Sequence, residues 1–374
     1  MKLVIAGGGT GGHLFPGIAV AEAVVDQDPG SEILFVGTQL GIEALAVPKA
    51  GFSVRFIQVG GLKGKDWRVR WKTITQLPLA VMQARKILQD FGAHVVLGVG
   101  GYASGPVMLA AKLLNLPTAI CEQNSVPGMT NRILGRVVDR ICTNFQAAHA
   151  YFPAHKIVST GNPVRRAFRQ RAALVRGVHE AGVVFIFGGS QGAQFLNKIA
   201  PRSLSLLQER GIKVKALHQC GKGAEQDVSA LYRAVGVEAE VYPFIEDMVS
   251  FYQRSAVVIC RAGATSCAEL TALGIPAVLV PFPHATDDHQ TRNAEELLRA
   301  GACKMVPQNQ LTPESLADEL LPLLSNDEIR NAMSEHSRRI GKLQAADMVA
   351  RLCFDISRNK EIRNHNDLQP GAAP

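Results

Sequence analysis

The chain begins with an apolar run, a glycine-rich turn and a second apolar run in immediate succession. Residues 2–6 read KLVIA, which is typical of a buried strand, and the turn 7–12 consists of glycines interrupted by one threonine. Pro16 is expected to open an apolar helix. Glycine lets the backbone approach a ligand closely, and the N–H groups at a helix N-terminus favour an anion. His13 lies at the mouth of this turn, so the pattern predicts a phosphate-type site beside a group that titrates near neutral pH.

This order of strand, glycine turn and helix recurs along the chain and constrains the fold. Further glycine turns follow candidate strands at 98–105, 188–192 and 261–265, so two turns lie in each half. The strands are continuous apolar runs, which is typical of parallel α/β sheets covered on both faces. Ligands of open α/β sheets bind at the carboxyl ends of strands, so we expect two Rossmann-like parallel-sheet domains facing each other across a cleft. The expected strands are 2–6, 32–37, 54–59, 94–99, 118–122, 139–143, 156–159, 183–187, 213–219, 239–243, 256–260 and 277–281.

Proline and composition mark the expected domain boundaries. The N-terminal domain is expected over 1–162 and the C-terminal domain over 163–340, because the proline at 163 interrupts regular structure. A C-terminal helix over 341–358 is expected to cross back to the N-terminal domain. The last stretch, 359–374, is expected to be a disordered tail.

Charge, cysteine content and hydropathy narrow the class of protein. The 374-residue chain has a formal net charge of +8, which favours an anionic partner such as a phosphate ligand, a nucleic acid or an acidic lipid. Its seven cysteines include no CxxC pair and are expected to be reduced thiols of a cytosolic protein. The first apolar run is too short for a secretory signal, and no run approaches the ~18 apolar residues of a spanning helix. A soluble or peripheral protein is expected.

The first turn also matches the dinucleotide fingerprint GxGxxG through Gly7, Gly9 and Gly12. A nicotinamide enzyme needs an acidic residue near the end of the second strand, but that strand runs into Thr38 without a carboxylate. The sequence therefore disfavours NAD and predicts no cofactor, although a purely structural turn stays an alternative. The run 287–289 (DDH) is too tightly spaced for chelation, so no metal is expected either.

Polar residues near other strand ends are further candidates for ligand contacts. Glu122 and Asn124 follow a strand and suit hydrogen bonds to a polar ligand. Ser190 lies in the glycine turn at 188–192, and Arg165 could supply charge to a diphosphate. Glu269 follows the last glycine turn and could hold a ribose diol with two hydrogen bonds. Each of these side chains could equally be an ordinary surface group.

Residues 62–72 bring five basic side chains and both tryptophans of the chain together, and an apolar run follows. Aromatic and basic residues in such a mixture suit an anionic membrane surface. Single-stranded nucleic acid suits the same mixture, and an ordinary amphipathic connection is the third alternative. The residues expected to face a membrane are Lys63, Lys65, Trp67, Arg68, Arg70, Trp71, Leu77 and Leu79.

A set of short motifs lies in a fixed order over roughly residues 2–350. They are Gly8–His13 with Pro16, Gly100–Tyr102 with Ser104–Pro106, Glu122–Asn124, Gly161–Arg165, Gly188–Ala193, Arg261–Glu269, Pro281, His289–Gln290 and Asn293–Ala294. Each motif is modest, but their conjunction is specific. It resembles the MurG family of bacterial glycosyltransferases, which have the GT-B fold.

The resemblance implies an inverting hexosyltransferase of peptidoglycan synthesis. Such an enzyme moves N-acetylglucosamine from UDP-N-acetylglucosamine to the C4 hydroxyl of lipid I, which is undecaprenyl-pyrophosphoryl-N-acetylmuramyl-pentapeptide, and so forms lipid II. It also implies a peripheral protein at the cytoplasmic face of the bacterial inner membrane. The lipid tail of the acceptor then accounts for the basic and aromatic window, with an anionic membrane surface and no nucleic acid as partner.

Carried over to this chain, the family's donor site comprises residues of both halves. Asn124 is expected to contact the donor sugar, Ile245 the uracil, and Glu269 the ribose. The other implied contacts to UDP-N-acetylglucosamine are Thr10, Gly11 and Gly12 at the donor–acceptor cleft, Arg165 and Ser190 at the diphosphate, Ala264, Thr265, Ser266, Cys267 and Ala268 at the nucleotide, and Gln290 at the sugar hydroxyls.

An inverting transfer needs a base for the acceptor hydroxyl and charge stabilisation for the departing UDP. His13 is the first candidate for the catalytic base, because an imidazole can take a proton near neutral pH. Glu122 is the second, because burial can raise the pKa of a carboxylate. Arg165 and the amides of the glycine turns would stabilise the diphosphate without a metal. A UDP-sugar epimerase of the same architecture and a non-catalytic nucleotide sensor are the rival functions.

Overall fold

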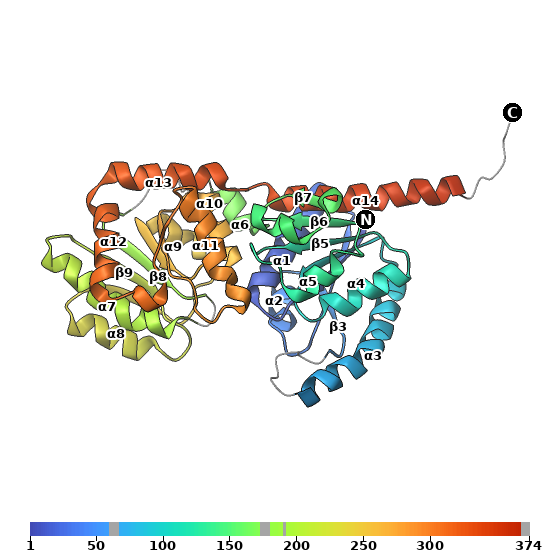
Figure 1. Ribbon diagram of the computed structural model, residues 1–374, viewed down its shortest axis with the longest axis horizontal. Coiled ribbons are helices and arrows are strands. Elements are labelled where there is room, and N and C mark those ends of the chain that lie inside the picture. The colour runs from blue at the N-terminus through green and yellow to red at the C-terminus, as the bar shows by residue number, and fades with distance from the viewer. Residues whose placement is uncertain (60–66, 173–179, 190–191, 368–374) are drawn as a thin grey trace. The chain divides into compact units, whose positions relative to one another are not determined.

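The computed structural model describes residues 1–59, 67–172, 180–189 and 192–367. The chain divides into two compact units. Unit 1 comprises residues 1–166 and 344–374, and unit 2 comprises 167–343. In each unit helices cover the two faces of a sheet (Figure 1).

Unit 1 contains a seven-stranded parallel sheet with the order β3-β2-β1-β4-β5-β6-β7. Its strands are β1 (Lys2–Gly7), β2 (Glu32–Gly37), β3 (Ser53–Phe56), β4 (Val95–Gly100), β5 (Thr118–Glu122), β6 (Arg140–Thr143) and β7 (Ile157–Ser159). Its helices are α1 (Gly11–Gln27), α2 (Glu43–Lys49), α3 (Trp67–Phe91), α4 (Ser104–Leu113), α5 (Met129–Leu134) and α14 (Ala345–Asp367), with short 3₁₀ turns η1 (Gln146–Tyr151) and η2 (Ala154–Lys156).

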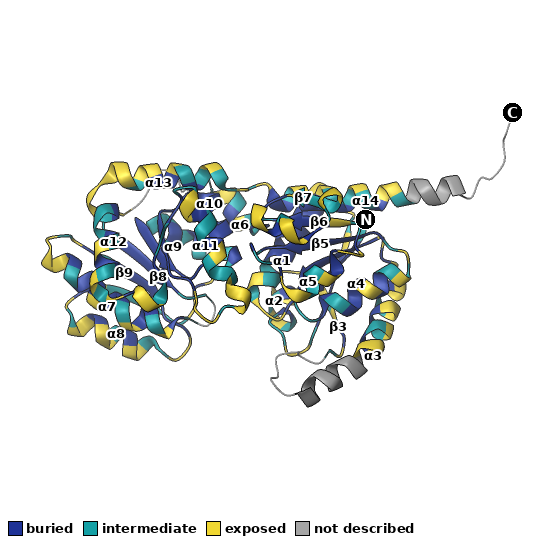
Figure 2. Ribbon diagram, viewed as in Figure 1, coloured by how far each residue is buried: buried dark blue, intermediate teal, exposed yellow. Residues whose placement is uncertain are grey.

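The sheet of unit 1 has an apolar core on each face, because successive side chains of a strand point to opposite sides. Leu3 and Ile5 of β1 pack in one core with residues of α1 and α14. Val4 and Ala6 pack in the other core with residues of α3 and α4. Figure 2 shows the strands buried and the outer surfaces of the helices exposed. The continuous apolar runs of the sequence therefore follow from burial on both faces.

Unit 2 contains a six-stranded parallel sheet with the order β10-β9-β8-β11-β12-β13. Its strands are β8 (Val183–Phe187), β9 (Lys215–Gln219), β10 (Glu238–Tyr242), β11 (Val257–Cys260), β12 (Ala277–Leu279) and β13 (Lys304–Met305). Its helices are α7 (Gln194–Glu209), α8 (Glu225–Ala234), α9 (Met248–Arg254), α10 (Ala264–Leu273), α11 (His289–Arg299), α12 (Pro313–Ser325) and α13 (Asp327–Ile340), with η3 (Thr286–Asp288) and η4 (Gln308–Gln310). Helix α6 (Arg166–Arg171) begins at the boundary between the units.

The predicted fold class of two parallel-sheet domains of the Rossmann type is confirmed, and strands form at all the expected places. Several details differ, among them the expected strands 213–219 and 277–281, which form only over Lys215–Gln219 and Ala277–Leu279. The expected strand 54–59 ends at Phe56, and the two-residue strand β13 was not predicted. Pro16 lies inside α1, which begins five residues earlier at Gly11.

The C-terminal stretch also differs from the prediction. Helix α14 continues to Asp367, so 359–367 is helical where a disordered tail was expected, and the remaining residues lie outside the described part of the chain. No helix in the described residues is both long enough and apolar enough to cross a membrane.

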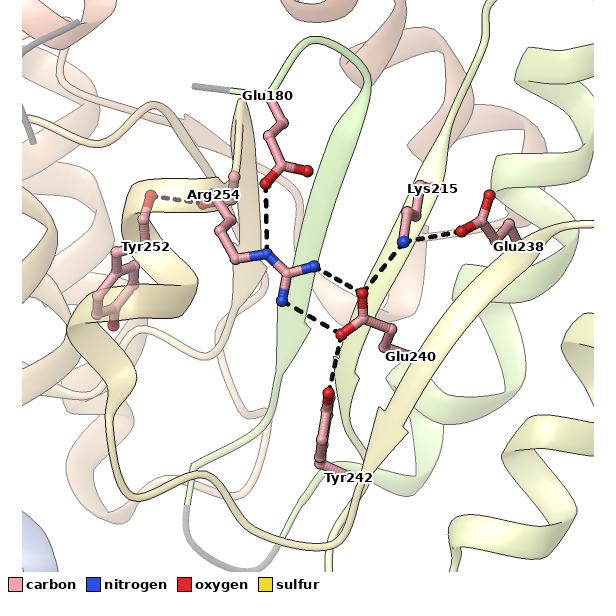
Figure 3. Close-up of polar contacts among 8 residues, drawn as sticks. Glu180, Lys215, Glu238, Glu240, Tyr242, Tyr252 and Arg254 are labelled. Carbon is pink, nitrogen blue, oxygen red and sulfur yellow. Dashed lines mark hydrogen bonds and ion pairs between the residues drawn. The ribbon is translucent and has the colours of Figure 1, made fainter. Parts of the chain in front are cut away.

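Charged side chains join the edge strand β10 to its neighbours in unit 2 (Figure 3). Glu240 accepts hydrogen bonds from Arg254 at 2.6 Å and from Tyr242 at 2.8 Å, and it pairs with Lys215 at 3.1 Å. Arg254 also pairs with Glu180 at 3.4 Å. The hydrogen bonds from Arg254, Tyr242 and Lys215 lower the pKa of Glu240 to about 2. The carboxylate is therefore ionised at neutral pH, and it ties the sheet edge to α9.

Candidate active site

The first glycine turn of unit 1 follows β1 and meets the turn that follows β4. Gly8 donates its backbone N–H to the carbonyl of Gly100 at 3.2 Å. A Cβ atom on Gly7 would collide with the carbonyl of Gly100, and one on Gly101 would collide with the carbonyl of Gly8. Both turns therefore need glycine because two backbones lie in direct contact at the carboxyl ends of neighbouring strands.

His13 lies in the first turn of α1, next to this meeting point. Its backbone N–H donates to the carbonyl of Thr10 at 3.2 Å. A Cβ on Gly100 would lie 2.7 Å from Nδ1 of His13, so the imidazole packs against the backbone of that glycine. The Nδ1 atom is buried whereas the residue as a whole is half-buried. Thr10 and Gly12, on either side of Gly11, are exposed.

Glu122, at the end of β5, is buried and bonded on both carboxylate oxygens. Oε1 accepts from the backbone N–H of Asn124 at 3.0 Å, and Oε2 accepts from the side-chain amide of Asn131 at 2.9 Å. Burial raises the pKa of the Glu122 carboxyl, while the hydrogen bonds from the two asparagines oppose that shift. The carboxylate thus holds the loop that carries Asn124, a half-buried residue.

Arg165 also lies in unit 1, at its junction with unit 2. Its guanidinium stacks over the ring of Phe15, 4.9 Å from the ring centroid. Phe15 in turn covers Gly11, where a Cβ would lie 2.9 Å from the ring. This cation–π contact places a fixed positive charge beside the first turn of α1.

In unit 2, Gln219 at the end of β9 links two of the predicted site segments. Its Nε2 donates to the carbonyl of Gly189, which follows β8, at 2.8 Å. Its Oε1 accepts from the backbone N–H of Ile245 at 3.3 Å. The glycine turn and the predicted uracil contact are thereby held in one arrangement. Ser190 lies outside the described residues.

Helix α10 begins at Ala264, directly after β11, with Gly263 as its N-cap residue. The N–H groups of its first turn have no partner within the helix and favour an anion. Glu269 lies further along the same helix, is buried, and accepts a hydrogen bond from the Tyr252 hydroxyl at 3.3 Å. The predicted nucleotide contacts Ala264, Thr265, Ser266, Cys267 and Ala268 all lie on this helix.

Gln290 is the last residue of the predicted set, and it contacts the loop after β12, as does Arg261, which was not predicted. Gln290 of α11 accepts the backbone N–H of Phe282 at 2.9 Å through Oε1, which leaves its Nε2 group to donate. Arg261 is buried and donates to the carbonyls of Val280 and Pro281 at 3.1 and 3.2 Å. Arg261 therefore fixes the loop after β12. In the described residues no three histidine, cysteine, aspartate or glutamate side chains lie close enough to hold a metal ion together.

The predicted membrane-facing residues are described only in part. Lys63 and Lys65 lie outside the described residues, and α3 includes Trp67, Arg68, Arg70 and Trp71 without a description of their side chains. Leu77 and Leu79 are exposed.

Sequence reasoning missed Glu43, Gln219, Asn131 and Tyr252. Glu43 and Gln219 follow or end a strand near a glycine turn, which is the signal that could have identified them. Asn131 and Tyr252 lie on helices and carry no such signal, because only the fold brings them to the carboxylates that they bond.

Family models match the two units in succession. The N-terminal domain of glycosyltransferase family 28 matches residues 3–143, and the C-terminal domain of that family matches residues 183–352. The chain belongs to glycosyltransferase family 28. The resemblance to the MurG family that the motifs indicated is thus confirmed at the level of whole domains.

Several full-length relatives share the name UDP-N-acetylglucosamine--N-acetylmuramyl-(pentapeptide) pyrophosphoryl-undecaprenol N-acetylglucosamine transferase. The protein of this name from Anaeromyxobacter sp. (strain Fw109-5) is 44% identical over 100% of this chain and 98% of its own length. That from Myxococcus xanthus is 45% identical over 95% of this chain and 93% of its own. The crystal structure of Acinetobacter baumannii MurG superimposes with a TM-score of 0.75 at 32% identity, and the match covers 95% of this chain and 99% of that one.

Proposed function

We propose that this family 28 enzyme transfers N-acetylglucosamine from UDP-N-acetylglucosamine to the C4 hydroxyl of undecaprenyl-pyrophosphoryl-N-acetylmuramyl-pentapeptide, with inversion at the anomeric carbon. The observation that carries the proposal is the full-length similarity to relatives named for this transfer. The described residues supply the groups that such a reaction needs, and they do so at the carboxyl ends of the strands in both units.

Unit 2 would hold the donor. The N-terminal amides of α10 suit an oxygen of the diphosphate. The backbone of the glycine turn after β8 would also lie close to the diphosphate. Glu269, a buried carboxylate of α10 that already bonds Tyr252, would accept hydrogen bonds from the ribose hydroxyls. Ile245, held by Gln219, would pack against the uracil.

The residues of unit 1 would supply the proton acceptor. The C4 oxygen of the acceptor forms a bond to the anomeric carbon while the bond from that carbon to the UDP oxygen breaks, and UDP leaves with the electron pair. The hydroxyl proton passes to Nε2 of His13, whose other nitrogen is buried against Gly100. Arg165, fixed by its stacking on Phe15, would offset charge on the departing diphosphate.

Of the two candidate bases, the geometry favours His13. Both oxygens of Glu122 accept hydrogen bonds from groups of the neighbouring loop, and the residue is buried. A proton acceptor must lie within reach of the acceptor hydroxyl, whereas Glu122 is placed to hold Asn124. We infer that Glu122 positions Asn124 for the donor sugar.

A transfer assay with radiolabelled UDP-N-acetylglucosamine and a lipid I analogue tests the proposal, with EDTA or with magnesium present. We expect labelled lipid product from the wild-type protein under both conditions. His13→Ala is expected to lower kcat by about 10²- to 10⁴-fold, the usual contribution of a general base, with UDP binding within about twofold of wild type.

His155→Gln, an exposed histidine of the same unit, is the control and should keep full activity. Near-wild-type turnover by His13→Ala would remove His13 from the mechanism. UDP binding without any transfer by the wild-type protein would favour the epimerase or the sensor instead.

We also infer that unit 1 rests on an anionic membrane surface, as a peripheral protein at the cytoplasmic face of the inner membrane. Helix α3 packs against α4, and α4 against α5. These three helices expose large apolar side chains, which we call the apolar surface of α3–α5. Its residues are Leu77, Leu79, Met82, Leu109, Leu113, Met129 and Ile133. The same helices carry Arg85 and Arg132, together with Lys86 and Lys112, which pair with Asp90 and Asp139, and exposed apolar groups beside arginines suit anionic lipid.

A further inference from the structure

We propose that Glu43 is a positioning residue that holds the first glycine turn in the shape that acceptor activation requires. The inference rests on the proposed function above. Three carboxylates are buried among the described residues, namely Glu43, Glu122 and Glu269. The last two belong to the candidate site, and Glu43, which is 1% exposed, lies beneath the turn that leads to His13.

The carboxylate of Glu43 ties together the loops that follow β1 and β2. Oε2 accepts the backbone N–H of Gly9 at 2.7 Å. Oε1 accepts the backbone N–H of Thr38 at 2.8 Å and the Thr38 hydroxyl at 3.0 Å. Removing a carboxylate from water costs several kcal/mol unless hydrogen bonds replace the solvent. Both oxygens here are satisfied, and by donors of two different loops.

The space around this side chain is formed by glycines. A Cβ on Gly8, Gly37 or Gly41 would overlap the carboxylate or the adjacent carbon of Glu43. Gly8 and Gly9 also have φ angles of +146° and +84°, which other residues rarely adopt. The glycines of this region thus serve to admit the Glu43 side chain and to let the turn bend over it.

This contact changes what the turn can bind. The N–H of Gly9 donates inward to Glu43 and that of Gly8 donates to Gly100, so neither amide is available to a phosphate. A negative charge directly behind the turn further disfavours an anion there. The phosphate site that the sequence predicted for this turn is therefore restricted, and its exposed residues Gly9 and Thr10 suit an uncharged sugar hydroxyl. Glu43 therefore fixes the conformation of the glycine turn that leads into α1 and His13.

The decisive variant is Glu43→Gln, which keeps the size of the side chain. All three contacts of Glu43 come from donors, and an amide NH₂ group cannot accept a hydrogen bond. One of the two loops must therefore lose its bond. We expect kcat to fall at least tenfold while the KM for UDP-N-acetylglucosamine and the Kd for UDP stay within twofold. Hydrogen exchange should rise in a peptide covering residues 6–12.

Asp139→Asn is the control for removal of a carboxylate charge in the same unit. Oδ2 of Asp139 accepts a backbone N–H and a hydroxyl, both from Thr118, at 2.8 and 2.7 Å, and Oδ1 pairs with Lys112, at the amino ends of β5 and β6. An asparagine keeps both Thr118 bonds through its amide oxygen and loses only the ion pair, so Asp139→Asn should keep full turnover whereas Glu43→Gln should lose it. Thr38→Val, which removes one donor, should lower kcat less than Glu43→Gln, and Thr38→Ser should restore it.

The outcomes separate the two proposals. Equal kcat losses in Glu43→Gln and Asp139→Asn, or unchanged kcat in Glu43→Gln, overturn the positioning role. If Glu43→Gln does not fold, the Thr38 variants test the role instead. A lower kcat in Thr38→Val that Thr38→Ser restores supports it, and unchanged kcat in Thr38→Val overturns it. Absence of transfer by the wild-type protein overturns the proposed function. The role of Glu43 is then tested by hydrogen exchange alone, and unchanged exchange at residues 6–12 in Glu43→Gln overturns it.

Discussion

Glu43, Glu122 and Glu269 are the buried carboxylates of the described residues, and each meets a different set of donors. Glu43 and Glu122 each accept a backbone N–H of a loop, that of Gly9 and that of Asn124, so both fix loop positions. Glu269 meets a tyrosine hydroxyl on another helix. The same residue type thus anchors a loop or bonds a neighbouring helix according to which donors the fold places around it.

His218 of β9 is a buried residue whose surroundings decide its charge. Its Nδ1 lies 2.9 Å from the Tyr232 hydroxyl, and its Nε2 lies 3.0 Å from Oδ1 of Asn197. Asn197 can only accept through that oxygen, so Nε2 carries the proton and Nδ1 accepts from the tyrosine. Burial lowers the pKa of His218 to about 3, and the folded protein keeps this ring neutral.

We predict that unit 2 loses stability in acid through His218. The unfolded chain binds a proton near pH 6.5, whereas the folded chain binds it only near pH 3. The free energy of unfolding therefore falls as the pH falls from about 6.5 towards 3, by about 2 kcal/mol between pH 7.5 and pH 5. Urea unfolding at the two pH values measures this.

His218→Gln should be less stable at pH 7.5 but should lack this part of the pH dependence. His155→Gln, which alters an exposed histidine, should keep the wild-type slope. Equal slopes in wild type and His218→Gln would show that the buried ring does not contribute.

At the scale of elements, the predictions succeeded where a local pattern is enough. Continuous apolar runs predicted the strands, and glycine turns predicted the points where loops lie at their carboxyl ends. The prediction missed strand β13 because two residues are too few to show a pattern. It also missed the helical continuation of α14 because residues 359–367 are polar. Of the apolar surface of α3–α5, the sequence indicated Leu77 and Leu79 of α3, and it missed the members on α4 and α5, which only packing brings beside α3.

We predict that this surface binds anionic vesicles. Leu113→Glu combined with Ile133→Glu should weaken co-sedimentation with vesicles containing anionic lipid by at least about tenfold, because two apolar contacts are lost and two repulsive charges are added. Activity on a soluble, short-chain acceptor should stay within twofold of wild type.

The control is Leu231→Glu on α8, an exposed apolar residue of unit 2, which should leave co-sedimentation unchanged. Unchanged co-sedimentation of the double variant would exclude the surface of α4 and α5 from lipid binding.

At the scale of the whole molecule, the chain returns to its first unit after completing the second. Residues 344–374 belong to unit 1, and α14 buries Ala346, Val349, Ala350 and Cys353 in the core that contains Leu3 and Ile5. The stability of unit 1 thus depends on residues more than three hundred positions away from its first strand.

Two adjacent residues of α14 test this dependence. Val349→Asp places a charge in the core and should destabilise unit 1 by more than about 3 kcal/mol. Met348→Asp changes an exposed neighbour and should stay within about 0.5 kcal/mol of wild type. Hydrogen exchange should rise in β1 and α1 for Val349→Asp and remain unchanged in β8 to β12. A uniform rise over both units, or none, would contradict the assignment of α14 to unit 1.

Local patterns in the chain were enough to predict the parallel α/β class, the strands and the glycine turns, because burial on both faces and positive φ angles leave signals in consecutive residues. They also named His13, Glu122, Asn124 and Glu269 as candidates, since polar residues after strands are local features. What these side chains contact depends on the tertiary structure, which places Asn124 and Asn131 at Glu122 and places Glu43 under the first glycine turn. Such contacts join residues distant in the chain, and their donors, burial and close approach exist only after the sheets have formed.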